Sequence, residues 1–433
     1  MIVRLTIAVG VLAIAFATAQ AATIHVDVGG GGDFLTIQEG VDAAASGDTV
    51  LVAPGTYTGA LNRDINFDGR LLKLIADGGR DATVIDCQSA GRAFVFSSGG
   101  TPDVRVEGFT VRNGAVGAGN GGAVSMAGGS ATFFECAFEN NSATWGGVFY
   151  LGHEAWPYIE YCTFEGNTAV DYGGCIYTYA SQPYVYECDF TNNTAGISGG
   201  AISCKTWTVA SIYNSRFIGN SAQDGGAIYI GTLFSLDDDV APSYIGFSWF
   251  EDNTADRGGA IFLNSFSWVT SMWNTLVRNT AQQGGAVFCQ TDAQGSLKLQ
   301  NCTLAYNHGE YGGGICSAGN SAYNHLTVEQ CVIAFSTSGN SLHRLDYSPV
   351  NADLSLAFGN EGGDVLYGGV RNLFVDPLFC DVYSDDFNLC ENSPCRSVNN
   401  EWGFLMGSFR QVCGECTTPV QETSWGSIKA MYR

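Results

Sequence analysis

Positively charged residues are scarce in this sequence. Among 433 residues there are 19 Lys and Arg against 42 Asp and Glu, which gives a formal net charge of −23 at pH 7. Nucleic-acid-binding proteins neutralise phosphates with clustered Lys and Arg, so this balance argues against a nucleic-acid partner. It also disfavours direct contact with anionic polysaccharides unless a metal ion lies between the two surfaces.

Long apolar runs are also rare, and the one candidate lies at the N-terminus. Arg4 precedes the short apolar stretch Leu5–Phe16, and small-residue cleavage patterns end at Ala19 and Ala21. This pattern predicts a secretory signal peptide over residues 1–21, because the stretch is too short for a stable spanning helix. We therefore expect a secreted or cell-surface protein with no transmembrane segment in the mature chain.

Proline is scarce, with 9 residues, whereas glycine is abundant, with 57. Paired glycines recur about every 26 residues, each before a short apolar run, and they begin at Gly121, Gly146, Gly173, Gly199, Gly225, Gly258, Gly284 and Gly312. Most units also contain F-x-x-N-(S/T)-A, as at Phe138 and Phe164. Short β-branched and aromatic runs at this period predict a solenoid and not a helical fold.

The fold class that we predict is all-β: a right-handed parallel β-helix whose turns stack at about 4.8 Å. One glycine of each pair takes a positive φ, and the stacking of neighbouring turns excludes side chains there. The Asn of F-x-x-N tolerates the left-handed region and forms a ladder along the axis, and the Phe forms an inward column. A buried column of small thiols is expected two residues before the Phe position, at Cys136, Cys162, Cys188, Cys302 and Cys331.

Both ends differ from the repeats. Residues 22–48 are expected to form an N-terminal lead-in and cap, with a helix over Phe34–Ala45 and Asp33 as its N-cap. The β-helix is expected over residues 49–375, and residues 376–433 form a Cys-rich C-terminal cap or tail.

Five cysteines lie in that C-terminal segment and are candidates for disulfides in an oxidising compartment: Cys380, Cys390, Cys395, Cys413 and Cys416. An odd number implies that one pairs elsewhere or stays free. Cys413-x-x-Cys416 also has the spacing of half a zinc site, but no second CxxC or His pair accompanies it, so disulfides are favoured.

The GGAI and F-x-x-N motifs between about residues 105 and 340 resemble the repeats of the polymorphic outer membrane proteins of chlamydiae and of bacterial right-handed β-helix repeat proteins. The lead-in GDFLTIQEGVDAAASGDTVLVAPGTY is similar to the N-terminal coil of pectin-active β-helix enzymes. The ending DPLFC…FNLCENSPC resembles that of exported β-helix proteins from environmental bacteria. These resemblances imply the fold, whereas the same scaffold carries lyases, hydrolases, esterases, adhesins and passive surface proteins.

A catalytic hypothesis rests on loops that follow the GGAI strands. The longest repeat inserts Asp237, Asp238 and Asp239, and the preceding repeat offers Lys205 in the same loop. Carboxylates that bind calcium beside a lysine base would suit a calcium-dependent polysaccharide lyase. A solvated acidic loop is the simpler interpretation, and calcium is the only cofactor under consideration.

A binding hypothesis rests on aromatic residues in the same loops: Trp156, Tyr179, Trp207, Phe234 and Trp268. A row of rings suits an extended glycan or a partner surface, although the rings could instead pack onto the wall. The role that we favour is non-catalytic recognition of a glycan or surface partner. A carbohydrate-active enzyme and a purely structural envelope protein are the alternatives.

Overall fold

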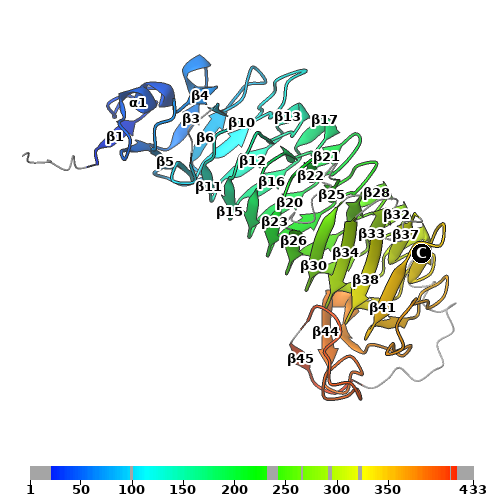
Figure 1. The fold of residues 1–433 in the computed structure, drawn as a ribbon. Coiled ribbons are helices and arrows are strands. Elements are labelled where there is room, and N and C mark those ends of the chain that lie inside the picture. Colours follow the sequence, from blue (N-terminus) through cyan, green and yellow to red (C-terminus); the bar gives the residue numbers. More distant parts are fainter. Residues whose placement is uncertain are drawn as a thin grey trace, which may run out of the picture.

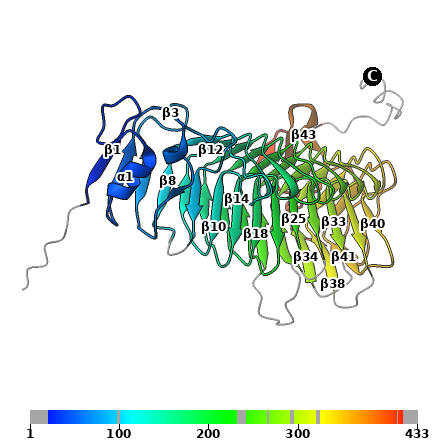
Figure 2. The ribbon, with the colours of Figure 1, turned by 90° about the horizontal axis from the view of Figure 1, so that it is seen from above.

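The computed structural model describes residues 21–97, 101–231, 242–264, 267–290, 295–319, 324–409 and 411–416. It is a parallel β-helix in which each turn contributes one strand to each of three long sheets (Figures 1 and 2). The predicted all-β solenoid is therefore confirmed. Within the described residues, no helix is long and apolar enough to cross a membrane.

The three long sheets are parallel throughout. Sheet A contains β1 (Thr23–Val26), β2 (Thr49–Val52), β5 (Lys73–Ala76), β8 (Arg105–Glu107), β11 (Thr132–Phe134), β15 (Tyr158–Glu160), β19 (Tyr184–Tyr186), β23 (Ser211–Tyr213), β26 (Ser243–Gly246), β30 (Trp268–Met272), β34 (Gly295–Gln300), β38 (Asn324–Glu329) and β41 (Val350–Asp353). Sheet B contains β3 (Gly55–Tyr57), β6 (Thr83–Asp86), β9 (Thr110–Arg112), β12 (Ala137–Glu139), β16 (Thr163–Glu165), β20 (Asp189–Thr191), β24 (Arg216–Ile218), β27 (Trp249–Glu251), β31 (Thr275–Val277), β35 (Thr303–Ala305), β39 (Val332–Ala334) and β42 (Leu356–Phe358). Sheet C contains β4 (Ile65–Asn66), β7 (Phe94–Phe96), β10 (Val124–Ala127), β14 (Phe149–Gly152), β18 (Ile176–Tyr179), β22 (Ile202–Lys205), β25 (Ile228–Ile230), β29 (Ile261–Leu263), β33 (Val287–Gln290), β37 (Ile315–Ala318) and β40 (Leu342–Arg344).

Shorter elements complete the molecule. Two small parallel sheets lie between sheets B and C in the chain order: β13 (Ser142–Trp145), β17 (Thr168–Tyr172) and β21 (Thr194–Ala195), and then β28 (Thr254–Arg257), β32 (Thr280–Gln283) and β36 (His308–Tyr311). A separate three-stranded sheet in the C-terminal segment contains β43 (Phe379–Asp381), β44 (Asp386–Cys390) and β45 (Val412–Cys413). The helical elements are α1 (Ile37–Ala43) and the 3₁₀ turns η1 (Ala60–Asn62) and η2 (Val382–Ser384).

The interior is built from side chains that repeat once per turn. Consecutive core phenylalanines from Phe138 to Phe250 stack with centroids 4.5–5.1 Å apart. Beside them, each buried ladder Asn from Asn141 to Asn279 donates its Nδ2 hydrogen to the Oδ1 of the next ladder Asn at 2.9–3.0 Å. The predicted ladder is confirmed. The positive φ, however, belongs to the residue before each ladder Asn, as at Asn140 and Asn192, and not to the ladder Asn itself.

The paired glycines have two different roles. The first of each pair has a positive φ near 65°, as at Gly199. The second lies against the next turn: a Cβ added at Gly200 would lie 2.1 Å from the carbonyl oxygen of Gly226. The predicted thiol column is also present, and Cys136, Cys162 and its other members are buried and free.

The N-terminal helix is shorter than the sequence pattern suggests. It spans Ile37–Ala43 and has Thr36, not Asp33, at its N-cap. Asp33 instead accepts a hydrogen bond from the backbone N–H of His25, and Phe34 forms a bridge with Val26. The pairing of this segment with β1 thus prevents the helix from starting earlier. The buried helix face, which includes Ile37 and Val41, covers the first turn (Figure 1).

The C-terminal Cys-rich segment lies along the side of the last turns (Figure 1). Phe387 is buried against Val277 and Ala305 on the outer face of sheet B. The end of the main core is instead contacted by Leu366 and Tyr367, which precede this segment. The sequence predicted that this segment caps the end of the solenoid. In the structure it instead covers a flank of the last turns.

Candidate functional site

Lys205 ends β22 and its amine lies between two aromatic rings. The Nζ atom is 3.6 Å from the ring centroid of Tyr229 and 4.4 Å from that of Tyr172. Tyr229 lies one turn further along sheet C, and Tyr172 belongs to β17. Such contacts attract the protonated amine to the ring faces.

The space for this amine arises from a gap in a column of rings on the outer face of sheet C. Tyr150 stacks on Tyr177, and Tyr229 stacks on Phe262. The residue aligned between Tyr177 and Tyr229 is Ser203, whose hydroxyl bonds to Ser198. Because serine is too small to continue the stack, the Lys205 side chain covers the Tyr229 ring instead.

Burial lowers the pKa of Lys205 to about 8, although the Asp224 carboxylate raises it. Asp224 itself forms a two-pronged ion pair with Arg257, with distances of 2.8 and 2.7 Å. At pH 7 an amine with this pKa keeps its proton in roughly nine molecules of ten. It becomes a base only in mildly alkaline solution, which is the chemistry that a proton-abstracting lysine needs.

The proposed calcium ligands Asp237, Asp238 and Asp239 lie outside the described residues, as does Phe234. Arg257, the partner of Asp224, also lies over an aromatic ring, with its guanidinium carbon 4.9 Å from the Phe262 ring centroid.

Of the other aromatic candidates, Trp156 and Trp207 lie between strands of sheet C and sheet A, whereas Tyr179 ends β18 and Trp268 begins β30. Trp156 and Trp268 are 52% and 45% exposed and occupy the same column, two residues before the paired positions Tyr158 and Thr270. They are four turns apart, and Gln182, Val209 and Pro242 hold the positions between them. These two tryptophans therefore do not stack as neighbours.

Tyr179 lies at the end of a strand of sheet C, and Trp207 lies just after the end of the next one. Tyr179 is paired with Lys205 across β18 and β22. Trp207 is 56% exposed and has a positive φ of 55°, in the turn that follows β22.

A larger set of rings, absent from our sequence-based candidates, lies on the outer face of sheet A. We call it the sheet A aromatic face, and it spans the six neighbouring strands from β11 to β30. Its members are Phe134, Tyr158, Tyr161, Tyr184, Tyr186, Tyr213, Tyr244, Phe247 and Trp273. Tyr158, Tyr161 and Phe247 are 41%, 39% and 51% exposed.

Rings on this face follow one another from turn to turn. The centroid of Tyr184 lies 5.3 Å from that of Tyr158 and 6.3 Å from that of Tyr213. Tyr161 and Phe247 occupy equivalent left-handed turns after their strands, which directs these side chains outward from the core. Trp156 and Trp268 lie toward the opposite ends of these strands, because each comes two residues before the paired positions Tyr158 and Thr270.

Carboxylates accompany the rings. Glu160 lies in register with Phe134 and Tyr186 on the neighbouring strands. Burial raises the pKa of Tyr184, and the nearby Glu160 carboxylate raises it further. The face therefore combines ring surfaces with hydrogen-bond acceptors of negative charge.

The sequence did contain a signal for this face. In PYIEYC and PYVYEC the residues on either side of the inward Ile159 and Val185 must point outward, because side chains alternate along a strand. The prediction considered the long loops, so the residues that it named lie beside this sheet and not on its outer face.

The fold and surface define a parallel β-helix repeat protein with an aromatic outer face. The model of the Chlamydia polymorphic membrane protein repeat matches residues 187–205 and 214–231, two segments that each contain F-x-x-N and GGAI motifs. No curated protein matches the chain.

Several solved structures resemble the chain at low sequence identity. The pectate lyase Pel9A is 14% identical, with a TM-score of 0.46, and the alignment covers 91% of this chain and 97% of that one. The mannuronan C-5 epimerase AlgE4 A-module of Azotobacter vinelandii is 12% identical, with a TM-score of 0.42 and coverages of 76% and 91%. The family 28 exopolygalacturonase of Yersinia enterocolitica is 13% identical, with a TM-score of 0.41 and coverages of 83% and 79%. TM-scores below 0.5 at this identity carry no argument about activity.

Proposed function

We propose that this protein is a secreted or cell-surface binding protein that holds a neutral, extended glycan on the sheet A aromatic face and does not cleave it. The observation that carries the proposal is the run of rings over six neighbouring strands, of which Tyr158, Tyr161 and Phe247 are exposed and the others are half-buried. Ring faces stack on the apolar faces of sugars, and an amphipathic ring such as Tyr also offers a hydroxyl.

Charge determines the class of glycan. With a net charge of −23 and Glu160 on the face itself, an anionic polysaccharide would be repelled. Sugar hydroxyls, in contrast, donate readily to carboxylates. The C-terminal disulfides and the match to a surface-protein repeat support an extracellular location.

The test is titration calorimetry of the chain from Ala22 onward with neutral and anionic oligosaccharides of matched length. We expect binding of a neutral oligosaccharide, weakened at least about tenfold, or 1.4 kcal/mol, in the double variant Tyr158→Ala, Tyr184→Ala. Tyr383→Ala is the matched control, because Tyr383 is 77% exposed but lies in the C-terminal segment. Equal binding by the double variant and the wild type would refute the proposal, as would a preference for anionic chains.

A second candidate function, the calcium-dependent lyase, is favoured by the lowered pKa of Lys205. Its test is the release of new chain ends from polysaccharides at neutral and mildly alkaline pH, with and without calcium. Ends that appear only with calcium and vanish in Lys205→Met would replace the binding proposal. No release on any substrate would eliminate the lyase.

A further inference from the structure

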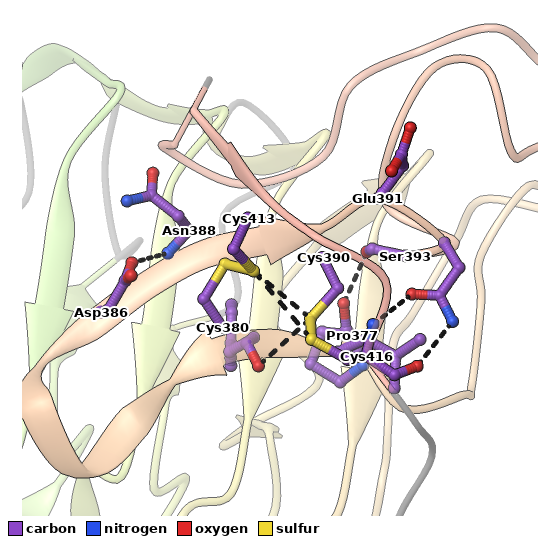
Figure 3. The surroundings of a disulfide bond; sticks show 12 residues. Pro377, Cys380, Asp386, Asn388, Cys390, Glu391, Ser393, Cys413 and Cys416 are labelled. Carbon is purple, nitrogen blue, oxygen red and sulfur yellow. Dashed lines mark hydrogen bonds between the residues drawn. A yellow bond between two sulfur atoms is a disulfide. The ribbon is translucent and has the colours of Figure 1, made fainter.

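The C-terminal segment brings four cysteine sulfurs to one place. The antiparallel pair β43 and β44 sets Cys380 beside Cys390, and the parallel pair β44 and β45 aligns Cys390 with Cys413. Cys416 follows Cys413 by three residues. The fold thus supplies the second cysteine pair whose absence from the local sequence had favoured disulfides over zinc (Figure 3).

In the structure these sulfurs form two disulfides, Cys380–Cys413 and Cys390–Cys416. The two bonds lie in contact, since the Cys413 sulfur is 3.7 Å from that of Cys390 and 4.0 Å from that of Cys416. The ligand sulfurs of Cys380, Cys390 and Cys413 all lie within 4.8 Å of one another. Two structural disulfides require no such convergence.

Two of the distances between sulfurs that are not bonded to each other, 3.7 Å from Cys413 to Cys390 and 4.0 Å from Cys413 to Cys416, match a tetrahedral metal site. With Zn–S bonds of about 2.3 Å, neighbouring sulfurs in a tetrahedral four-cysteine site lie about 3.8 Å apart. Once the disulfides are reduced, the bonded pairs must separate to about this distance.

The surrounding backbone is already held in place. Asn392 accepts the N–H of Cys416 at 3.1 Å and donates to its carbonyl oxygen at 2.8 Å. Glu391 donates its backbone N–H to Gly414 inside the CxxC turn at 3.1 Å. These contacts fix the CxxC turn beside Cys390 without using any sulfur atom, so they survive reduction.

We propose that Cys380, Cys390, Cys413 and Cys416 form a four-thiolate zinc site in the reduced chain, and that the disulfide and zinc forms exclude each other. Two equivalents of a dithiol reductant transfer four electrons and four protons to the two S–S bonds and are themselves oxidised to disulfides. Zinc then displaces four protons from the four thiols. Reoxidation by two equivalents of a small-molecule disulfide transfers four electrons from the thiolates to that oxidant, which takes up four protons and becomes four thiols, and the two S–S bonds re-form as the metal is released.

Cobalt provides the test, because tetrahedral cobalt thiolates absorb in the near-ultraviolet and visible ranges. The chain from Ala22 onward is reduced with a dithiol, freed of it under argon and titrated with Co²⁺. We expect one cobalt per chain with tetrahedral thiolate bands, which zinc bleaches. The oxidised chain should show none. Cys413→Ser should abolish the bands, whereas Cys395→Ala, which changes a buried free cysteine outside the cluster, should keep them.

A second measurement needs no variant. Zinc should slow the alkylation of the four cluster cysteines in the reduced wild type by at least about tenfold, as read by mass spectrometry of the peptides. A folded, reduced chain without thiolate bands, or alkylation of these four cysteines at an unchanged rate, overturns the proposal. Equal cobalt binding by Cys413→Ser and Cys395→Ala also overturns it.

Discussion

Arg278 on the flank of the solenoid lies 2.7 Å from the carboxylate of Asp385, which is 107 residues further along the chain. The same guanidinium also contacts Glu251 on the neighbouring strand of sheet B. These contacts raise the pKa of Arg278 against the opposing effect of burial. One side chain therefore joins the repeats to the C-terminal segment.

Replacing this arginine should loosen the segment without unfolding the repeats. In Arg278→Met we expect hydrogen exchange in β44 to accelerate about threefold to tenfold, because partly exposed ion pairs contribute up to about 1 kcal/mol each. Arg371→Met is the control, since Arg371 pairs with Asp353 away from this segment. Unchanged exchange in β44 would show that the other contacts of the segment, such as the apolar packing of Phe387 and Leu389, hold it without this ion pair.

Truncating the side chain of one ladder asparagine should lower the free energy of unfolding. Asn220 is fully buried, donates to the carbonyl oxygen of Phe190 and to Asn253, and accepts two bonds from Asn193. Asn220→Ala leaves buried donors unpaired and should lower the free energy of unfolding by about 2–5 kcal/mol, measured by urea denaturation. Asn192→Gly, at an exposed left-handed position, should change it by less than about 0.5 kcal/mol.

Adding a methyl group between two turns should lower the stability of the fold strongly. Gly200→Ala sets a Cβ 2.1 Å from the Gly226 oxygen and 2.6 Å from the Ser221 nitrogen, both of which are backbone atoms. We expect a loss of several kcal/mol or failure to fold, seen by circular dichroism and thermal melting. Gly117→Asn is the comparison, because Gly117 has open space around it and Asn tolerates its φ of 56°. Similar melting of both variants would contradict this account.

Lys205 should make stability depend on pH. Its pKa is about 8 in the folded chain and about 10.5 in the unfolded chain. Between these values the unfolded state binds more protons, so the contribution of Lys205 to stability rises with pH. The free energy of unfolding of Lys205→Met minus that of the wild type should therefore fall by about 1–2 kcal/mol between about pH 7.5 and 9.5.

Chemical denaturation at several pH values measures this difference. Lys73→Met, at an exposed residue of β5, serves as the control and should show no such trend. A flat difference for Lys205→Met would mean that the amine is solvated despite its place between Tyr172 and Tyr229.

The inward columns were predictable because each one repeats in the sequence. Phe138, Asn141 and Gly146 recur in phase, and stacking requires that equivalent residues contact each other. Features that depend on two different turns were not predictable. The place of Lys205 depends on Ser203 being too small to fill a ring column, which appears only once the register is known.

The C-terminal cysteines illustrate the same limit. Their number suggested disulfides, but the approach of Cys380 and Cys390 to the CxxC turn depends on the pairing of β43 with β44 and of β44 with β45. The predicted boundaries of the N-terminal helix were wrong for a related reason, because Phe34 pairs with Val26 before the helix begins.

The ladder of asparagines bears on how such a chain changes its length. Each ladder Asn bonds to the preceding and following turns, so removing or duplicating one whole turn still places an Asn beside an Asn at the junction. Among the described residues, the apolar contacts of the C-terminal segment are with the part of the solenoid that begins at about Trp249, so they do not involve the earlier turns. An insertion or deletion of one whole turn upstream of that flank therefore lengthens or shortens sheet A by one strand.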